Sequence, residues 1–465
     1  MQTTEHKKSV KFLLPPGPKG RFYVGSLPER RRDPIGLFLG AARTYGDVVC
    51  FSFGPRKVFL VNSHENVKHV LVDNHKNYIK GFGYDKLEPM LGKGLLTSEG
   101  EFWRQQRKLS QPIFHRQRLA ALADAMTEKT AAMLDGWEQK YETSGGQEPI
   151  FFDVAAEMMR LTLRVVSQTL LGTDISGGDA DAVGKSLTAL IAETNRRILS
   201  LFPLPLTVPT PQNIKIKKDL RVINDVVYRI IKEHRQATEE APDLLTMLMK
   251  ARDEDTGIGM TDTQLRDEVM TMFLAGHETT ANALSWTLYL LSKNPGVERK
   301  LVDELESVLG GRRPGFNDLS QLKYTAMVLE EALRLYPPAW IFSREAVAND
   351  VIGGFKIPKN GIVVMSPYVT HRNTKYWDNP EGFDPERFTP ENSASRPKFA
   401  YFPFSGGPRI CIGQQFAMME AQLVLAMVLQ KYRCDLMPGY NVQAEPLLTL
   451  RPRGGLMMGL VRRKA

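Results

Sequence analysis

The chain has 465 residues, enough for two or three average domains or for one large one. Hydrophobic residues make up 42% of it and charged residues 24%, a balance that excludes a disordered or collagen-like chain. The net charge of +9 is small for this length, and no basic stripe carries interleaved aromatic residues. We therefore expect no nucleic-acid partner.

The cysteines and the apolar runs of the sequence indicate in which cellular compartment the protein is expected. Cys50, Cys411 and Cys434 are too few for a disulfide framework and fit a reducing environment. The longest uncharged helical run, residues 279–292, is shorter than the roughly 20 apolar residues that cross a membrane. The N-terminus has no signal-peptide pattern. We expect a cytoplasmic protein without a transmembrane anchor.

The predicted elements begin after an extended N-terminal arm, residues 1–20. Pro15-Pro16-Gly17-Pro18 favours neither a helix nor a central strand. Two strands, at 48–53 and 58–61, are predicted around the turn that starts at Gly54-Pro55. Helical spacing then dominates residues 99–250.

The most strongly predicted helix lies between Thr261 and Pro295. Thr261 and Gln264 have capping-box spacing, and Pro295 prevents continuation, so the helix is about 30 residues or roughly 45 Å long. Its centre, residues 269–286, is apolar on nearly every side, which indicates burial. One island interrupts this pattern, Ala275-Gly276-His277-Glu278-Thr279-Thr280.

The remaining elements follow in the C-terminal part. We predict a helix at 317–336, short strands within 351–365, a Pro-rich stretch at 379–405 and a last helix at 414–432. There is no internal repeat and no Gly/Ser linker. Since helices dominate between strands at the two ends, we predict one mainly α domain with small β-sheets over residues 1–465.

Cys411 occupies a Gly-rich loop at the start of the last predicted helix. Backbone N–H groups and the helix dipole at such a position favour the thiolate over the thiol. Cys50 and Cys434 are interpreted as small buried hydrophobic residues. The loop closely resembles the haem-binding signature of the cytochrome P450 family, Phe-x-x-Gly-x-Arg-x-Cys-x-Gly, met here by Phe404, Gly407, Arg409, Cys411 and Gly413.

The resemblance extends over essentially the whole chain. It implies the cytochrome P450 fold, with a haem b between the long central helix and the helix after the Cys411 loop. Cys411 is then the thiolate ligand of the iron, and Phe404 and Gly413 belong to the haem-binding loop. Glu331 and Arg334 match the family's Glu-x-x-Arg helix, and Arg387 its meander motif; these three are expected to form a structural triad.

The island breaks local rules in the middle of a buried helix. Gly276 costs about 1 kcal/mol relative to alanine, and the threonine hydroxyls compete for backbone carbonyls. The residues alone leave open a kinked helix whose threonines bond to the preceding turn. By the resemblance, Ala275 and Gly276 lie over the haem and open a groove for dioxygen. Thr279 then hydrogen-bonds iron-bound oxygen and Glu278 relays protons, whereas His277 is expected to pack.

The resemblance also assigns the haem rim. Trp103 and Arg107 match the family's propionate clamp, and Arg344 and Arg409 complete the set. A related group carries an esterified glutamate at the position of Ala275, so we expect a non-covalent haem. The expected substrate pocket is apolar and consists of Phe82, Leu87, Leu96, Ala275, Ala339, Ile341, Phe342, Leu447 and Leu448.

The most favoured function is that of a haem-thiolate monooxygenase that inserts one atom of O2 into a lipophilic substrate, such as a fatty acid, terpenoid or steroid-like molecule. Leu96 stands where some fatty-acid hydroxylases of the family carry phenylalanine, which leaves more room for cyclic ligands. The alternatives are a non-catalytic haem-thiolate sensor or binding protein, and a peroxide-driven peroxygenase or isomerase. The Glu278-Thr279 pair makes both less favoured.

Electrons are expected from a separate partner, a ferredoxin or flavodoxin with its reductase, because no reductase follows residue 465. A basic patch of four residues is the expected docking surface. We expect a monomer. The patch consists of Arg104, Lys108, Arg116 and Arg118.

Overall fold

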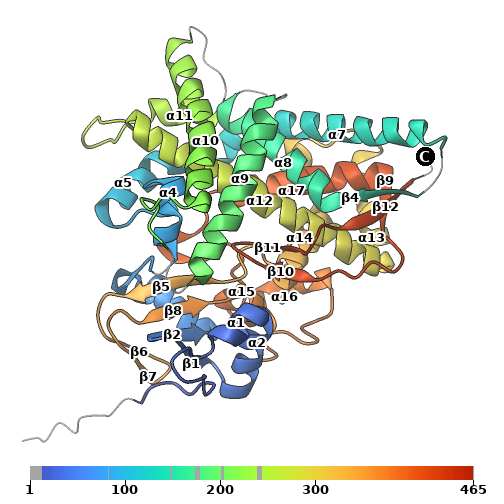
Figure 1. Cartoon of the computed structure of the whole chain (residues 1–465). Helices are drawn as coiled ribbons and strands as arrows, with labels where there is room; N and C mark the ends of the chain where they lie inside the picture. Colours follow the sequence, from blue (N-terminus) through green and yellow to red (C-terminus); the bar gives the residue numbers. More distant parts are fainter. Residues whose placement is uncertain are drawn as a thin grey trace, which may run out of the picture. The chain divides into compact units, whose positions relative to one another are not determined.

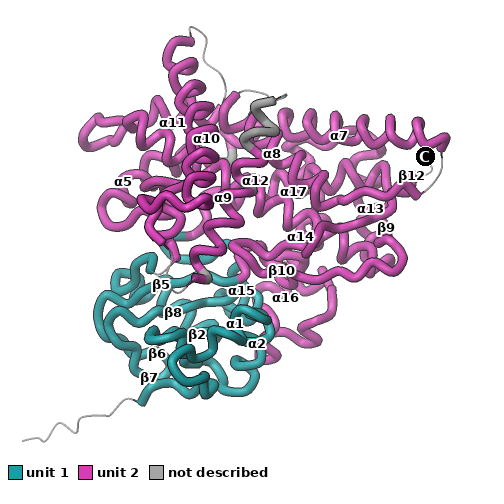
Figure 2. Tube along the Cα trace, viewed as in Figure 1, with its two compact units in different colours: residues 1–82, 341–370, 397–409 teal, residues 83–340, 371–396, 410–465 magenta. Residues whose placement is uncertain are grey.

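The computed structural model describes residues 13–81, 83–146, 149–172, 178–200, 204–237 and 243–463. Two compact units are distinguished by their internal contacts, and Figure 2 colours them separately. Unit 1 comprises residues 1–82, 341–370 and 397–409, and unit 2 comprises 83–340, 371–396 and 410–465. The mainly helical class with small sheets is confirmed (Figure 1). The single-domain assignment stays a prediction.

Unit 1 is built around a five-stranded sheet of order β1-β2-β8-β5-β3. The predicted hairpin is confirmed: β1 pairs antiparallel with β2, whereas β2 and β8 run parallel. The turn at Gly54-Pro55 is tighter than predicted, because the second strand already begins at Arg56. The strands of this sheet are β1 (Val48–Phe53), β2 (Arg56–Val61), β3 (Tyr78–Ile79), β5 (Phe342–Ala346) and β8 (Ile362–Met365), and β6 (Asp350–Ile352) and β7 (Phe355–Ile357) form a separate antiparallel pair. The helices are α1 (Leu27–Arg32), α2 (Pro34–Tyr45), α3 (His64–Lys68) and α15 (Pro367–Thr370).

The N-terminal arm lies against the edge of this sheet. Its described part, residues 13–20, contains no helix, and the Cys50 amide donates to the Pro16 carbonyl (2.8 Å). A Cβ atom on Gly17 would come within 1.9 Å of the Cys50 carbonyl oxygen, so the close approach requires glycine. Residues 1–12 lie outside the described residues.

Unit 2 contains most of the helices. Its first half holds α4 (Glu88–Leu91), α5 (Gly100–Ser110), α6 (Arg116–Ala120), α7 (Ala123–Thr143), α8 (Val154–Leu171), α9 (Gly178–Leu199), α10 (Pro211–Gln236) and α11 (Leu244–Lys250). Its second half holds α12 (Asp262–Lys293), α13 (Pro295–Leu309), α14 (Lys323–Leu335), α16 (Pro390–Ser395) and α17 (Gln414–Lys431).

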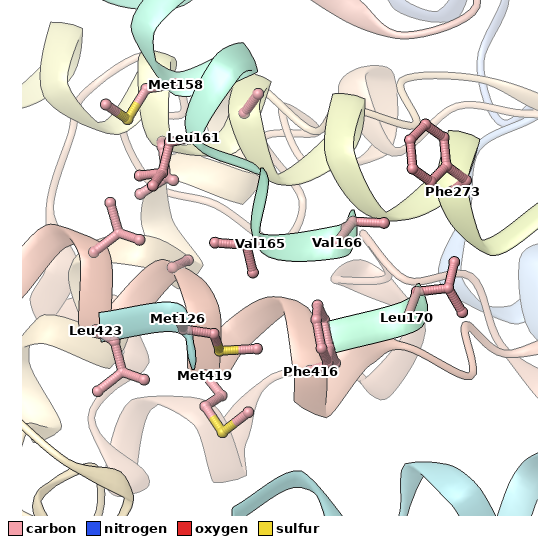
Figure 3. Packing of buried hydrophobic residues seen from close by; sticks show 14 of the residues in the cluster. Met126, Met158, Leu161, Val165, Val166, Leu170, Phe273, Phe416, Met419 and Leu423 are labelled. Atoms are coloured by element: carbon pink, nitrogen blue, oxygen red, sulfur yellow. The ribbon is translucent and has the colours of Figure 1, made fainter. Parts of the chain in front are cut away.

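The long helix α12 has the predicted ends. The Thr261 hydroxyl accepts from the Gln264 amide while the Gln264 side chain accepts from the Thr261 amide, and α13 begins at Pro295. Most of α12 is buried, and it packs against α8. Figure 3 shows part of this core, where side chains of α7, α8, α12 and α17 interdigitate, among them Met126, Val165, Val166, Phe273, Phe416 and Met419.

Two small sheets complete unit 2. The three-stranded sheet has the order β4-β12-β9, and β10 and β11 form a separate hairpin. Strand β4 was not predicted from the sequence, in which helical spacing dominates residues 99–250; four residues are too few to show a period. The strands are β4 (Ile150–Asp153), β9 (Tyr432–Leu436), β10 (Ala444–Pro446), β11 (Leu450–Pro452) and β12 (Met457–Arg462). Within the described ranges, no helix combines the length and the apolar character that a membrane crossing requires.

Candidate active site

The Cys411 loop begins in unit 1 with residues whose backbone is tightly constrained. Gly407 has φ +66°, and a Cβ atom there would lie 1.9 Å from the Leu71 carbonyl oxygen. On Gly406, a Cβ atom would come within 2.4 Å of the Phe399 ring. Phe404 and Arg409, which flank these glycines, are half-buried. Glycine is therefore required here for packing within unit 1.

Cys411 itself lies in unit 2, two residues before the Gly413 N-cap of α17. It is the exposed cysteine of the three; Cys434 is buried in β9 and Cys50 is half-buried in β1. Burial among protein atoms nevertheless raises the pKa of the Cys411 thiol, opposed by a hydrogen bond from the Gly413 amide and by Arg107. Cys411 is therefore exposed as a residue, although the protein atoms around its thiol disfavour the charged form.

Desolvation disfavours the charged form of Cys411, whereas the Gly413 amide and Arg107 favour it. Ligation of a metal ion releases the proton of a thiol. The expectation that Cys411 acts as a thiolate stays a prediction.

Arg107 connects α5 to this loop within unit 2. Its Nη1 donates to the Ile410 carbonyl (2.9 Å), next to Cys411, and burial lowers the pKa of the Arg107 guanidinium. Trp103, one turn earlier on α5, is half-buried like Arg107. The two predicted rim residues thus share one side of α5, and Arg107 already holds the loop backbone.

The island on α12 exposes one narrow face. Ala275 is exposed, and Gly276 and Thr279 are half-exposed, although the helix around them is buried. Thr279 donates to the Ala275 carbonyl (2.6 Å) and Thr280 to the Gly276 carbonyl (3.1 Å). Both threonines are therefore bonded to the preceding turn, as the residues alone had suggested. We call Ala275, Gly276 and Thr279 the accessible face of α12.

Gly276 also has a packing reason. A Cβ atom on it would lie 3.0 Å from a methyl group of Val166 on α8. Its small size thus permits the close approach of α8 and α12, besides leaving space on the accessible face.

Glu278 points away from the accessible face into the protein. It is 3% exposed, and its Oε1 accepts from the Thr449 hydroxyl (2.8 Å). Burial raises the pKa of the Glu278 carboxyl, and Thr449 and Arg451 partly offset this rise. Neighbouring His277 is buried as predicted, with Nδ1 2.8 Å from the Phe273 carbonyl oxygen, and burial lowers its pKa.

The predicted triad residues lie together in unit 2. Arg334 is bonded to both carboxylate oxygens of Glu331, and Arg387 Nε lies 3.4 Å from Glu331 Oε1. Arg334 also donates to the carbonyls of His371 (2.9 Å), Pro380 (2.6 Å) and Gly382 (2.7 Å). The contacts thus fasten the segment 371–387 to α14.

The predicted pocket residues of unit 2 differ in their exposure to solvent. Leu87 is 3% exposed and belongs to the core, and its place in the wall of the substrate pocket stays a prediction. Leu96, Leu447 and Leu448 are half-buried, and Ala339 is exposed.

In unit 1, Ile341 and Phe342 are half-buried, and Arg344 is buried on β5 with Nη1 donating to the Ser343 carbonyl (2.8 Å). Phe82 lies outside the described residues.

The basic patch is partly neutralised by the chain itself. Arg104 forms an ion pair with Glu101, and Lys108 donates to Asp255 (2.8 Å) close to Asp253 and Glu254. Arg118 on α6 is exposed. Two of the four expected docking cations thus have acidic neighbours, which the spacing of basic residues alone does not reveal.

Two buried polar residues of the site were missed by the sequence analysis. Thr449, beside the predicted Leu448, contacts Glu278 across 171 residues of sequence. Glu420 on α17 is completely buried; neither of its oxygens has a well-formed hydrogen bond among the described residues, and its pKa is raised well above 4.5 by burial, with Thr280 a weak counterweight. A signal existed for Glu420, which is an isolated acid in the apolar helix 414–432.

Comparison with known proteins gives the class. The family model described as Cytochrome P450 matches residues 15–458. The chain is similar to cyclooctatin synthase of Streptomyces melanosporofaciens, with 36% identity over 97% of this chain and 96% of the relative. It is also similar to cyclooctat-9-en-7-ol 5-monooxygenase of the same organism (33%; 88% and 86%) and to pentalenene oxygenase of Streptomyces avermitilis (32%; 92% and 92%). The chain belongs to the cytochrome P450 family of haem-thiolate monooxygenases.

Proposed function

We propose that this enzyme hydroxylates or otherwise oxygenates a cyclic terpenoid, using a non-covalent haem b and electrons from a separate ferredoxin or flavodoxin. Three similar proteins carry names that refer to cyclooctatin, cyclooctat-9-en-7-ol and pentalenene. The half-buried leucines at 96, 447 and 448 suit an apolar substrate held by shape. The terpenoid class is therefore favoured over fatty acids and steroids.

The residues present fit a haem. Cys411 is an exposed residue whose thiol has desolvated surroundings, and α12 exposes a face made of small residues where its other faces are packed. A flat macrocycle needs this combination of an accessible ligand atom and a helix face without large side chains. The accessible face of α12 is the single observation that carries the proposal, because a purely structural helix would fill it.

The haem, when bound, supplies the reductive activation of dioxygen and the transfer of one oxygen atom. The overall reaction converts a substrate C–H group, O2, two electrons and two protons into an alcohol and water. By the family resemblance, Cys411 would ligate the iron, and the Arg107 guanidinium holds the carbonyl of the neighbouring Ile410. Phe404 would pack at the haem, and Trp103, Arg344 and Arg409 would bind its propionates.

The protons are handled by two neighbouring side chains of α12. Thr279 offers a hydroxyl on the accessible face, and its bond to the Ala275 carbonyl orients that hydroxyl. Glu278 holds a proton at neutral pH more readily than an ordinary glutamate, because its pKa is raised by burial. This acid and this oriented alcohol, adjacent in sequence, are the groups that we propose for proton delivery.

The first test is the carbon monoxide difference spectrum of the reduced protein. We expect the red-shifted Soret band of a thiolate ligand in the wild type and in Cys50→Ser, and its loss in Cys411→Ser. Product analysis with a surrogate ferredoxin and reductase then compares cyclic terpene alcohols with fatty acids. Haem binding with no oxygenation of any substrate would favour a sensor, and oxygenation with peroxide alone a peroxygenase.

A further inference from the structure

The backbone of the β10–β11 hairpin is fixed to its surroundings by three hydrogen bonds. Trp340 Nε1 donates to the Leu447 carbonyl (3.0 Å), and Trp286 Nε1 donates to the Leu450 carbonyl (3.0 Å). The Leu450 amide donates in turn to the Pro338 carbonyl (2.9 Å). The turn that carries Leu447 and Leu448 is therefore held on both sides of Thr449.

The Thr449 hydroxyl uses both of its hydrogen-bonding roles on α12. It donates to Glu278 Oε1 (2.8 Å) and accepts from Asn282 Nδ2 (3.1 Å). Glu278 and Asn282 are four residues apart and so share one side of the helix. Thr449 and Asn282 are buried, at 7% and 2% exposed, so water does not compete for these bonds. The direction of the hydroxyl proton is thereby fixed toward the carboxylate.

The charges around Glu278 make this single bond important. Arg451 on β11 is the charged group acting on Glu278, and it is shared with Glu445 on β10, whose Oε2 lies 2.9 Å from Arg451 Nε. His277, the other titratable group of the island, bonds to the Phe273 carbonyl on its own helix. The Glu278 carboxylate thus has one direct donor from the hairpin and one divided, more distant cation.

We propose that Thr449 is a positioning residue that orients the Glu278 carboxyl and ties it to the hairpin of Leu447 and Leu448. The bond links the acid that supplies protons to the segment expected to touch the substrate. The hydroxyl also favours the charged form of the carboxyl, so Glu278 can release its proton and be reprotonated. The role in proton delivery rests on the proposed function; the positioning of the carboxyl does not.

The test measures the protonation of the Glu278 carboxyl directly. In the haem-loaded protein, the infrared band of protonated Glu278 is obtained as the difference from Glu278→Gln and is titrated with pH. In Thr449→Val we expect the midpoint to move to higher pH and the band to change frequency, because the donor is lost. Thr449→Ser, which keeps the hydroxyl, is expected to restore both. Thr130→Val is the matched control, since Thr130 is buried on α7 and bonds to the Met126 carbonyl.

A kinetic measurement distinguishes a failure of the positioning role of Thr449 from a failure of the proposed function. Loss of a general acid typically costs 10²-fold or more; for Thr449→Val we expect a smaller loss, roughly tenfold, in product formed per reductant consumed. We also expect a larger solvent isotope effect. An unchanged infrared midpoint in a folded Thr449→Val protein overturns the positioning role even if oxygenation proceeds. A shifted midpoint in a protein that oxygenates nothing supports the positioning role and rejects the function.

Discussion

Arg334 Nε and Nη2 lie 2.6 Å and 2.8 Å from the two carboxylate oxygens of Glu331, one turn earlier on α14, and both side chains are completely excluded from solvent. Desolvation raises the pKa of Glu331, and the hydrogen bonds and charge of Arg334 oppose this rise. Such a pair stabilises a fold only as long as both partners are present.

Removing one partner should therefore be costly. We expect Glu331→Gln to lower the free energy of unfolding by about 3–5 kcal/mol, because the Arg334 charge stays buried without its counterion. Glu101→Gln is the matched control, since the Glu101–Arg104 pair has the same spacing but is 83% and 65% exposed; its effect should stay below about 1 kcal/mol. Urea unfolding followed by circular dichroism measures both, and equal effects would contradict the argument.

The contact of Arg107 with the Ile410 carbonyl predicts a defect in haem retention. Arg107→Ala should release the backbone beside Cys411 and, under the proposed function, remove a cation that would bind the haem. We expect purified Arg107→Ala to contain less haem per polypeptide and to lose it faster to a haem-scavenging apoprotein. Arg104→Ala, on the same helix but exposed, is the control. Full haem content in Arg107→Ala would refute the clamp.

Thr279 and Thr280 should respond differently to loss of the hydroxyl. Thr279→Val removes the hydroxyl of the accessible face, so reductant should still be consumed while product per reductant falls at least about tenfold. Thr280→Val removes a buried hydroxyl bonded to the Gly276 carbonyl and should mainly reduce stability. Product, peroxide and reductant are measured together in each variant. Equal coupling in the wild type and Thr279→Val would argue against the proton role.

Because Glu420 is buried and its pKa is raised, we expect the stability of the protein to depend on pH. The folded chain retains a proton on Glu420 that the unfolded chain releases above about pH 4.5. Stability should therefore fall as the pH rises from there toward the raised pKa of the folded state, by up to about 1.4 kcal/mol per pH unit. In Glu420→Gln this contribution is absent, so the curve of unfolding free energy against pH should be flatter. A curve parallel to that of the wild type, as expected for the exposed Glu391→Gln, would count against a buried neutral acid.

Docking of the electron donor should depend on salt and on Arg118. Because Arg104 and Lys108 are paired with acidic residues of the chain, Arg118→Glu should slow reduction by an acidic ferredoxin more than Arg104→Ala does. The difference should shrink above about 0.5 M salt, where the Debye length falls to a few ångströms. Stopped-flow reduction rates measure this, and indifference to salt would reject the docking surface.

Elements whose signals lie within their own segment could be predicted from the sequence, and the others could not. Both ends of α12 were predicted correctly because the Thr261 cap and Pro295 lie within the segment itself. The helix predicted at 317–336 instead begins at Lys323, since its first amides are capped by Glu304 of α13, which accepts from Tyr324 (2.6 Å) and Thr325 (2.8 Å). A cap supplied by another helix leaves no local pattern.

The residues of the candidate site also differ in whether their sequence signal is local. Cys411 could be chosen among three cysteines because its loop and helix are contiguous, and its exposure agrees with that choice. The link between Glu278 and Thr449 depends on tertiary packing, and so does the neutralisation of Lys108. Periodicity and spacing contain no information about either.

The glycines at 276 and 407 impose different limits on how this sequence can diverge. A methyl group at 276 meets a side-chain methyl of Val166, so Gly276→Ala is open to compensation by Val166→Ala. At 407 it would meet the Leu71 carbonyl from a left-handed backbone position, and no side-chain exchange removes a main-chain oxygen. A paired library of the two positions should therefore recover double variants at 276 and 166, and only glycine at 407.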